Sequence, residues 1–306
     1  MLARVAADTV LVLGGSGLVG SGVQRRWDGE LTVEAPSHAQ LDVLDPRAME
    51  AFLRQSRADV VLNLAAWADV DRAEPERGDP SGRVYQLNVA HPERLARLCS
   101  ELRKHLVHVS TDYVFDGTNA QRPYNENDRT NPLGWYAETK LRGEQAILES
   151  GTHACIARIE MPFTGAEHVR KLDFARLCAS RLGAGQAIQG VTDQRVTPVF
   201  LDDAVDALRR LIEARYEGIV HVAAATWTTP YDFASAIAGR LHLDQTLIQP
   251  EPFERFAPRR PARRPQHSWL DVAAFNGAFG EGILRSVDEQ LDAWTKQLAT
   301  MPSRTS

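Results

Sequence analysis

Cysteine is scarce in this chain of 306 residues. Cys99, Cys155 and Cys178 are odd in number and far apart, so the sequence predicts neither a disulfide framework nor a zinc site. His105 and His108 lie three residues apart, but only His108 clearly belongs to the neighbouring apolar run. We therefore expect no bound metal, and we expect the reducing environment of the cytoplasm.

Long apolar runs and a strong excess of one charge are also missing. No apolar run approaches the length of a membrane span, and Met1–Asp8 lacks the apolar segment and cleavage site of a secretory signal. The net charge of −5 gives no general reason to expect a nucleic-acid partner. A composition of 43% apolar and 25% charged residues indicates a globular protein without a membrane partner.

Short apolar runs alternate with helical patterns in the first half of the chain. This alternation predicts an α/β fold, a Rossmann-type doubly wound parallel sheet with ligands beyond the carboxyl ends of its strands. We expect a nucleotide-binding lobe over residues 1–160 and a smaller, mainly substrate-binding lobe over 161–306, with segments near 186–223 returning to the sheet. The expected strands of the first lobe are 9–13, 31–35, 59–64, 106–110 and 155–159.

A glycine-rich turn comes after the first of these strands and opens a helix. Glycine lets the backbone approach a pyrophosphate, and the start of the helix offers unpaired N–H groups to an anion. A purely structural turn would also use glycine, but the strand-turn-helix context favours a dinucleotide site. The candidate cofactor contacts here are Gly14, Ser16, Gly17, Leu18 and Gly20.

The choice between NADPH and NADH depends on the residues after the second strand. Glu34 is the only acid close to the position that often holds the ribose 2′-hydroxyl of NAD, and it can equally lie within the strand. Arg25 and Arg26 are within reach of a 2′-phosphate, although a solvated helix end explains them equally well. We expect NADPH, with NADH also usable. Asp42 and Val43 are candidate adenine contacts, and Asp42 can alternatively cap a helix.

The third and fourth strands end in small and hydroxyl-bearing residues. Asn63, Ala65 and Ala66 suit a backbone that passes close to a cofactor, or else a tight contact between sheet and helix. Thr111 ends the fourth strand, where a hydroxyl can hydrogen-bond a carbonyl undergoing reduction. A lone hydroxyl at such a place more often caps a turn. Thr111 becomes a candidate because a tyrosine and a lysine lie downstream of it.

Tyr136 and Lys140 are spaced so that a helix places both on one face. With only six tyrosines and four lysines in the chain, chance rarely produces such a pair. A nearby cation favours the phenolate form of a tyrosine, which allows proton exchange with a carbonyl or an alcohol. An ordinary amphipathic helix is the alternative.

Together these residues resemble the dTDP-4-dehydrorhamnose reductase family of the extended short-chain dehydrogenase/reductase superfamily. The resemblance covers nearly the whole chain and rests on five stretches. They are residues 63–74 (NLAAWADVDRAE), 110–117 (STDYVFDG), 131–144 (NPLGWYAETKLRGE), 193–198 (DQRVTP) and 262–271 (ARRPQHSWLD).

The resemblance implies catalysis by Thr111, Tyr136 and Lys140. Tyr136 would protonate the oxygen as hydride reaches the C4 carbonyl of dTDP-4-dehydrorhamnose, giving dTDP-L-rhamnose. Lys140 would hold the nicotinamide ribose and tune the phenol, and Thr111 would hydrogen-bond the same oxygen. Related dehydratases carry Thr-Asp-Glu at this strand end. Because Tyr113 cannot take the role of that Glu, reduction is favoured over dehydration.

The candidate contacts of the nucleotide sugar are Val70, Tyr113, Met161 and Arg264. Met161 stands where the reductases carry a Trp, so the sequence leaves the hexose open. A planar guanidinium such as that of Arg264 can grip a diphosphate through paired hydrogen bonds, whereas the Pro- and Arg-rich stretch around it can also be a solvated loop.

Two alternatives to this reductase remain at the level of sequence. A similar fold forms the non-catalytic, NADP-binding regulatory subunit of methionine adenosyltransferase, and the stretch from Gln194 to Pro198 resembles that subunit faintly. The other alternative is a reductase or epimerase of a different nucleotide sugar. A homodimer is possible in each case.

Overall fold

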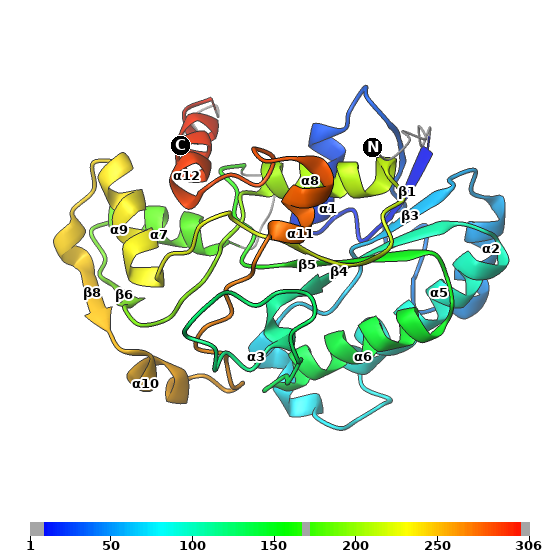
Figure 1. Ribbon diagram of the computed structural model, residues 1–306, viewed down its shortest axis with the longest axis horizontal. Helices are drawn as coiled ribbons and strands as arrows, with labels where there is room; N and C mark the ends of the chain where they lie inside the picture. The colour runs from blue at the N-terminus through cyan, green and yellow to red at the C-terminus, as the bar shows by residue number, and fades with distance from the viewer. Residues whose placement is uncertain (1–8, 167–171, 301–306) are drawn as a thin grey trace.

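A six-stranded parallel sheet forms the centre of the computed structural model, which describes residues 9–166 and 172–300 (Figure 1). Its strand order is β2-β1-β3-β4-β5-β7, and every neighbouring pair is parallel. The strands are β1 (Thr9–Leu13), β2 (Thr32–Glu34), β3 (Val60–Asn63), β4 (His105–Thr111), β5 (Ala154–Ile159) and β7 (Gly218–Val222). The predicted Rossmann-type fold is confirmed, and the order of strands reverses between β1 and β3.

The sheet is apolar on both faces because helices cover both. Successive residues of β1 point to opposite faces, so Val10 and Val12 join one buried cluster and Leu11 and Leu13 another. In Figure 1, α1, α8 and α11 lie on one face and α2, α5 and α6 on the other. These helices are α1 (Leu18–Arg26), α2 (Pro46–Gln55), α5 (His91–Glu101), α6 (Trp135–Glu149), α8 (Leu201–Glu213) and α11 (Ala273–Phe279).

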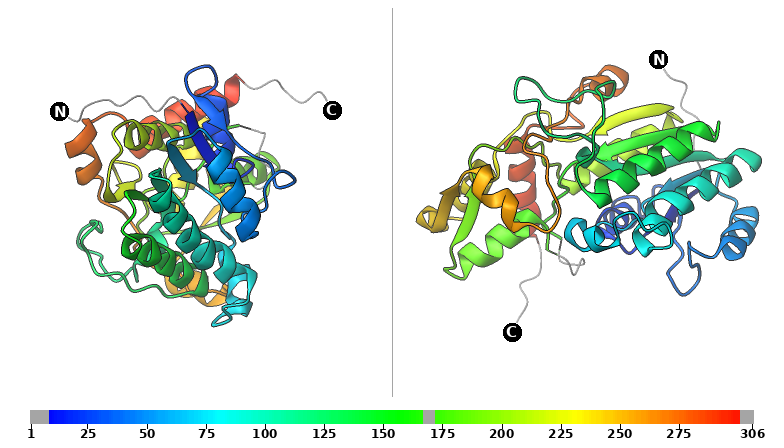
Figure 2. Two further views of the ribbon diagram at one scale, coloured as in Figure 1. Left: turned by 90° about the vertical axis from the view of Figure 1, so that its right-hand side faces the viewer. Right: turned by 90° about the horizontal axis from the view of Figure 1, so that it is seen from below.

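A separate C-terminal unit lies beside the sheet (Figures 1 and 2). Two short parallel strands, β6 (Ile188–Val191) and β8 (Ile248–Glu251), pair with each other, and apolar residues of three helices pack around them. Of the segments near 186–223, β7 joins the large sheet, whereas β6 pairs with β8 instead. The helices of this unit are α7 (Phe174–Gly183), α9 (Pro230–Arg240) and α12 (Val287–Ala299).

The remaining helices are short: α3 (Val70–Ala73), α4 (Arg83–Tyr85) and α10 (Phe253–Phe256). Among the residues that the structure describes, no helix is both long enough and apolar enough to cross a membrane.

The helix leading into α5 contains a π-helical turn over Gln86–Ala90. Asn88 in this turn donates a hydrogen bond from its side chain to Thr139 of α6, at 3.1 Å. Its backbone carbonyl lies against Gly143, where an added Cβ atom would come within 2.2 Å of the oxygen. A π turn is often found at a functional or closely packed place. Here it allows the helix before α5 to approach α6, which carries Tyr136 and Lys140.

The substitution Gly143→Ala tests this close approach. The new methyl group meets backbone rather than a flexible side chain, so we expect a loss of about 1–3 kcal/mol in the free energy of unfolding. Gly277→Ala in α11 is the matched control, because no atom lies within 4 Å of its added Cβ, and it should be neutral or slightly stabilising. Urea unfolding measures both variants. An equal change in the free energy of unfolding in both variants would show that the two helices can separate without cost.

Candidate active site

The glycine-rich turn between β1 and α1 passes tightly under the end of β3. Gly14 has φ +82°, and a Cβ atom there would lie 2.7 Å from the amide nitrogen of Ala65. A Cβ atom on Gly20 would lie 2.5 Å from the Gly14 carbonyl oxygen. Gly17 begins α1 without a side-chain cap, so the first N–H groups of the helix keep their capacity to bind an anion.

A pocket opens above this turn at the carboxyl end of β1. Of the predicted cofactor contacts, Gly14, Ser16, Val43 and Ala65 line it, and Gly17, Leu18 and Gly20 lie in the adjoining turn and helix start. Sequence reasoning missed the other lining residues, although the apolar spacing of Leu41 and Val43 was a usable signal. The crowded glycines and the uncapped helix start suit an anion such as a pyrophosphate, and the pocket lies beside them. The missed lining residues are Leu13, Gly15, Pro36, His38 and Leu41.

Three other predicted cofactor contacts lie outside this lining. Asn63 is fully buried, and its side chain faces His91 and His108 instead. Asp42 is exposed and accepts a hydrogen bond from the backbone of Leu44, which closes a turn, while the cap of α2 is Asp45. Ala66 is half-buried just after the end of β3.

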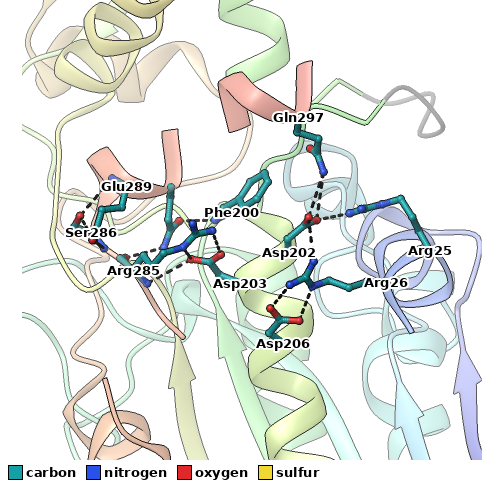
Figure 3. Close-up of polar contacts among 11 residues, drawn as sticks. Arg25, Arg26, Phe200, Asp202, Asp203, Asp206, Arg285, Ser286, Glu289 and Gln297 are labelled. Carbon is teal, nitrogen blue, oxygen red and sulfur yellow. Dashed lines mark hydrogen bonds and ion pairs between the residues drawn. The ribbon is translucent and has the colours of Figure 1, made fainter. Parts of the chain in front are cut away.

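The charged residues considered for cofactor choice have other partners. Arg25 pairs with Asp202 of α8, and Arg26 pairs with Asp202 and Asp206, so both arginines hold α1 against α8 (Figure 3). Glu34 accepts a hydrogen bond of 2.6 Å from the Ser56 hydroxyl.

Thr111 and Tyr136 meet at the carboxyl end of β4. Thr111 is the last residue of the strand, and Tyr136 lies in the first turn of α6, whose start is capped by a hydrogen bond of 2.9 Å from the Trp135 amide to Glu74. The Thr111 hydroxyl lies near enough to the Tyr136 phenol to act on its pKa. Burial raises the pKa of Tyr136 to about 12, although the nearby Thr111 hydroxyl opposes this shift.

Lys140 lies deeper than Tyr136 and points elsewhere. Its Nζ donates to the Val109 carbonyl at 2.7 Å and lies 3.2 Å from Nε2 of His108. Burial lowers the pKa of Lys140 to about 8. The structure contains no described hydrogen bond from Lys140 to the phenol, so the expected lowering of the pKa of Tyr136 is wrong for this arrangement. Desolvation, which penalises phenolate, is the largest cause of the raised pKa of Tyr136.

A chain of buried polar groups continues behind Lys140. Nδ1 of His108 lies 3.0 Å from the amide nitrogen of Asn63, and the amide oxygen of Asn63 lies 3.2 Å from Nε2 of His91. Burial lowers the pKa of His91 to about 4 and that of His108 well below its ordinary value, so both rings are neutral at physiological pH. His108 lies among the apolar residues of β4, and its position there was the sequence signal for this row of buried polar groups.

Of the predicted substrate contacts, Tyr113 meets Tyr136 directly. The Tyr113 ring meets that of Tyr136 edge to face, with centroids 6.3 Å apart. Nη2 of Arg264 lies 2.9 Å from the carboxylate of Asp71, next to Val70 in α3, and Nη1 of Arg264 is buried without a hydrogen-bond partner. Arg264 is also close enough for its charge to act on Tyr113.

Met161 lies just after β5 and has φ +39°, a strained conformation for a residue with a side chain. Arg263, in contrast to Arg264, is exposed. In the parts of the chain that the structure covers, no group of three or more His, Cys, Asp or Glu residues is placed to hold a metal ion.

Comparison with known proteins places this arrangement in a family. The family model described as RmlD substrate binding domain matches residues 8–301. The chain therefore belongs to this family. A dTDP-4-dehydrorhamnose reductase of Mycolicibacterium smegmatis is 34% identical over 270 residues, which cover 87% of this chain and 79% of the relative.

More distant relatives agree with this placement. The crystal structure of a dTDP-4-dehydrorhamnose reductase from Clostridium acetobutylicum superposes with a TM-score of 0.86 at 26% identity, covering 95% of this chain and all of that one. Methionine adenosyltransferase 2 subunit beta of Rattus norvegicus is 28% identical over 283 residues, or 88% of this chain and 82% of the relative. The resemblance to the dTDP-4-dehydrorhamnose reductase family is thus confirmed.

The ionisation of Lys140 in this member of the RmlD family can be measured through stability. Between about pH 8 and the ordinary lysine pKa of 10.5, the unfolded chain binds a proton that the folded chain does not. The free energy of unfolding of the wild type should therefore rise with pH relative to Lys140→Met, by about 3 kcal/mol at most over this interval.

Urea unfolding of both proteins over this pH range tests the expectation. The variant also loses the hydrogen bond to Val109, which changes its free energy of unfolding by an amount that does not depend on pH. The test is therefore how the difference in free energy between the two proteins changes with pH. A difference that stays constant with pH would mean that Lys140 keeps its ordinary pKa.

Proposed function

We propose that this protein reduces the C4 keto group of a nucleotide-linked 6-deoxyhexose with NADPH, converting dTDP-4-dehydrorhamnose to dTDP-L-rhamnose. The observation that carries the proposal is the placement of Thr111 at the end of β4 near Tyr136 in the first turn of α6, at the same edge of the sheet as the glycine-lined pocket. The names of the relatives at 34% and 26% identity support it.

In this proposal each residue of the site has one task. The reduced nicotinamide cofactor supplies hydride to C4 when it is bound. Tyr136 is protonated at physiological pH, because burial raises its pKa, and it donates its proton to the C4 oxygen. Thr111 positions the Tyr136 oxygen next to the C4 oxygen of the substrate. Lys140, with a pKa of about 8, binds the nicotinamide ribose as an amine or an ammonium.

Arg264 is our candidate for holding the diphosphate of the substrate. Its Nη1 group is buried and unpaired, and such a donor costs free energy unless a ligand accepts its hydrogen bond. Asp71 fixes the other side of the guanidinium. Val70, Tyr113 and Met161 complete the proposed sugar pocket, and Met161 is the residue that we expect to decide which hexose fits.

The surroundings of the pocket support NADPH with NADH as a usable second cofactor. Glu34 is held by Ser56 and so is not free to bind a ribose 2′-hydroxyl in the way that a typical NAD-binding acid does. Arg25 and Arg26 are occupied by α8. His38, which lines the pocket, is our candidate for contact with the phosphate.

The role of a regulatory subunit of methionine adenosyltransferase is the second candidate. The subunit beta of methionine adenosyltransferase 2, at 28% identity, supports this role less strongly than the reductases support the reduction. Stable capture of a methionine adenosyltransferase by the purified chain, without any sugar-dependent oxidation of NADPH, would favour this role. The expected homodimer, the cytoplasmic location and the two-lobe division stay predictions.

The direct test is oxidation of NADPH and of NADH by purified protein, with and without dTDP-4-dehydrorhamnose generated in the assay. We expect oxidation that depends on the sugar and is faster with NADPH. Cofactor binding without oxidation would contradict the proposed reaction and point to a different nucleotide sugar or to the regulatory role.

Tyr136→Phe removes the proposed acid while keeping the ring. We expect kcat to fall by roughly 100-fold or more, because general acid catalysis typically contributes 10²–10⁴-fold. The dissociation constant of NADPH, measured by fluorescence, should change little. Unchanged turnover would remove Tyr136 from the mechanism.

Arg264→Ala tests the diphosphate contact, with the exposed neighbour Arg263→Ala as the matched control. We expect the KM of the sugar nucleotide to rise by about 10-fold or more in the first variant, since hydrogen bonds to charged groups contribute about 1.5–3 kcal/mol. The KM of NADPH should stay the same. Equal increases for both ligands, or equal effects of both substitutions, would count against a diphosphate contact at Arg264.

A further inference from the structure

Two buried carboxyl groups lie behind Thr111. Asp112 is the next residue after Thr111 and is 3% exposed, and Glu160 comes directly after β5 and is fully buried. The Ser268 hydroxyl donates to Oε1 of Glu160 at 2.7 Å and is near enough to Asp112 to act on its pKa. Among residues 9–166 and 172–300, neither acid forms an ion pair with a basic side chain.

The hydrogen bonds around Glu160 favour its ionised form. Its Oε2 accepts from the Thr197 amide at 2.7 Å and from the Thr197 hydroxyl, in addition to the bond from Ser268 to Oε1. Three donors directed at one carboxyl group stabilise a carboxylate. A proton shared between the two acids is therefore better placed on Asp112.

Asp112 has the opposite surroundings. Its Oδ1 lies 3.0 Å from the Thr111 hydroxyl, and its Oδ2 is buried without a hydrogen-bond partner. An unpaired buried oxygen costs less on a neutral acid than on a carboxylate. The ionisable groups that face Asp112 are Glu160, Tyr113 and Tyr136, none of which can offer a positive charge, and Arg264 acts on Tyr113 beyond them. Burial, and after it the charge of Glu160, raises the pKa of Asp112 well above its ordinary value.

The protonation of Asp112 decides where the Thr111 proton points. The Thr111 oxygen has two lone pairs and one proton. One lone pair accepts the amide of Tyr113 at 3.3 Å. If Asp112 is a neutral acid, it donates to the second lone pair, and the Thr111 proton is free to point to the nearby Tyr136 oxygen. If Asp112 is a carboxylate, it accepts the Thr111 proton instead and leaves none for the reacting oxygens.

We propose that Asp112 is a positioning residue that acts as a neutral carboxylic acid, kept in that form by Glu160, and that it orients the Thr111 hydroxyl as a donor to the Tyr136 oxygen. The inference rests on the proposed reduction, in which Tyr136 gives its proton to the substrate. A donor from Thr111 then stabilises the phenolate that remains on Tyr136. No other group gains or loses a proton in this step.

Infrared spectroscopy tests the protonation without any substrate. We expect the C=O stretch of a protonated carboxyl group in the wild type at about pH 8, where a carboxyl group of ordinary pKa is fully ionised. This band should disappear in Asp112→Asn. In Glu160→Gln it should remain but titrate at lower pH, because the neighbouring negative charge is gone. A wild-type spectrum without the band, or a band that persists in Asp112→Asn, overturns the proposal.

Kinetics of three proteins test the orientation. The amide of Asp112→Asn can still donate to Thr111, so we expect kcat within about 3-fold of the wild type, whereas Asp112→Ala should lose on the order of 100-fold, as for the loss of one preorganised donor. With rising pH, kcat of the wild type should fall as the infrared band disappears, and Asp112→Asn should lack that step. Thermal unfolding and NADPH binding establish that each variant is folded.

A different pattern overturns the proposal. If Asp112→Asn loses as much kcat as Asp112→Ala, a carboxylate rather than a neutral donor is required. The proposed reduction and the proposed role of Asp112 can be contradicted separately. The infrared band without sugar-dependent oxidation of NADPH would contradict the reductase and leave the state of Asp112 intact, whereas oxidation without the band would contradict only the role of Asp112.

Discussion

The parallel pairing of β1, β3 and β4 is the constraint on which the rest of the site depends. Parallel strands end at the same edge of a sheet, so the register that sets Leu13 beside Asn63, and Asn63 beside His108, also brings the glycine turn close to Thr111. The helix α6 then returns over β4 and β5 and presents Tyr136 to the same edge. Without this register, residues a hundred positions apart would not lie at the same edge of the sheet.

Desolvation controls the chemistry within that frame. Lys140, Asp112 and Glu160 are each almost completely removed from water, and burial is the first cause of every pKa shift among them. A charge that is buried without a close partner tends to be neutralised rather than tolerated. The site consequently offers a neutral phenol at the point where a carbonyl oxygen needs a proton, and in our proposal a neutral Asp112 stands behind Thr111.

Polar contacts also join the sheet to the rest of the chain. Arg25 and Arg26 hold α1 against α8, and Gln297 of α12 adds a contact to Asp202 (Figure 3). Glu160 connects the end of β5 to Thr197 and, through Ser268, to the stretch that carries Arg264. The residues that position substrate and the residues that carry out the chemistry are therefore linked through buried hydrogen bonds rather than through loose loops.

The sequence alone determined the fold and singled out the proposed catalytic residues, because both depend on local patterns. Apolar runs, glycine spacing and the interval between Tyr136 and Lys140 are properties of neighbouring residues. The pairing of β6 with β8, the partners of Arg25 and Glu34, and the distance of Lys140 from the phenol were decided only by tertiary structure. So was the meeting of Asp112 with Glu160, which lie 48 positions apart. Ionisation and orientation depend on burial and on contacts between distant segments, and a linear pattern does not contain these quantities.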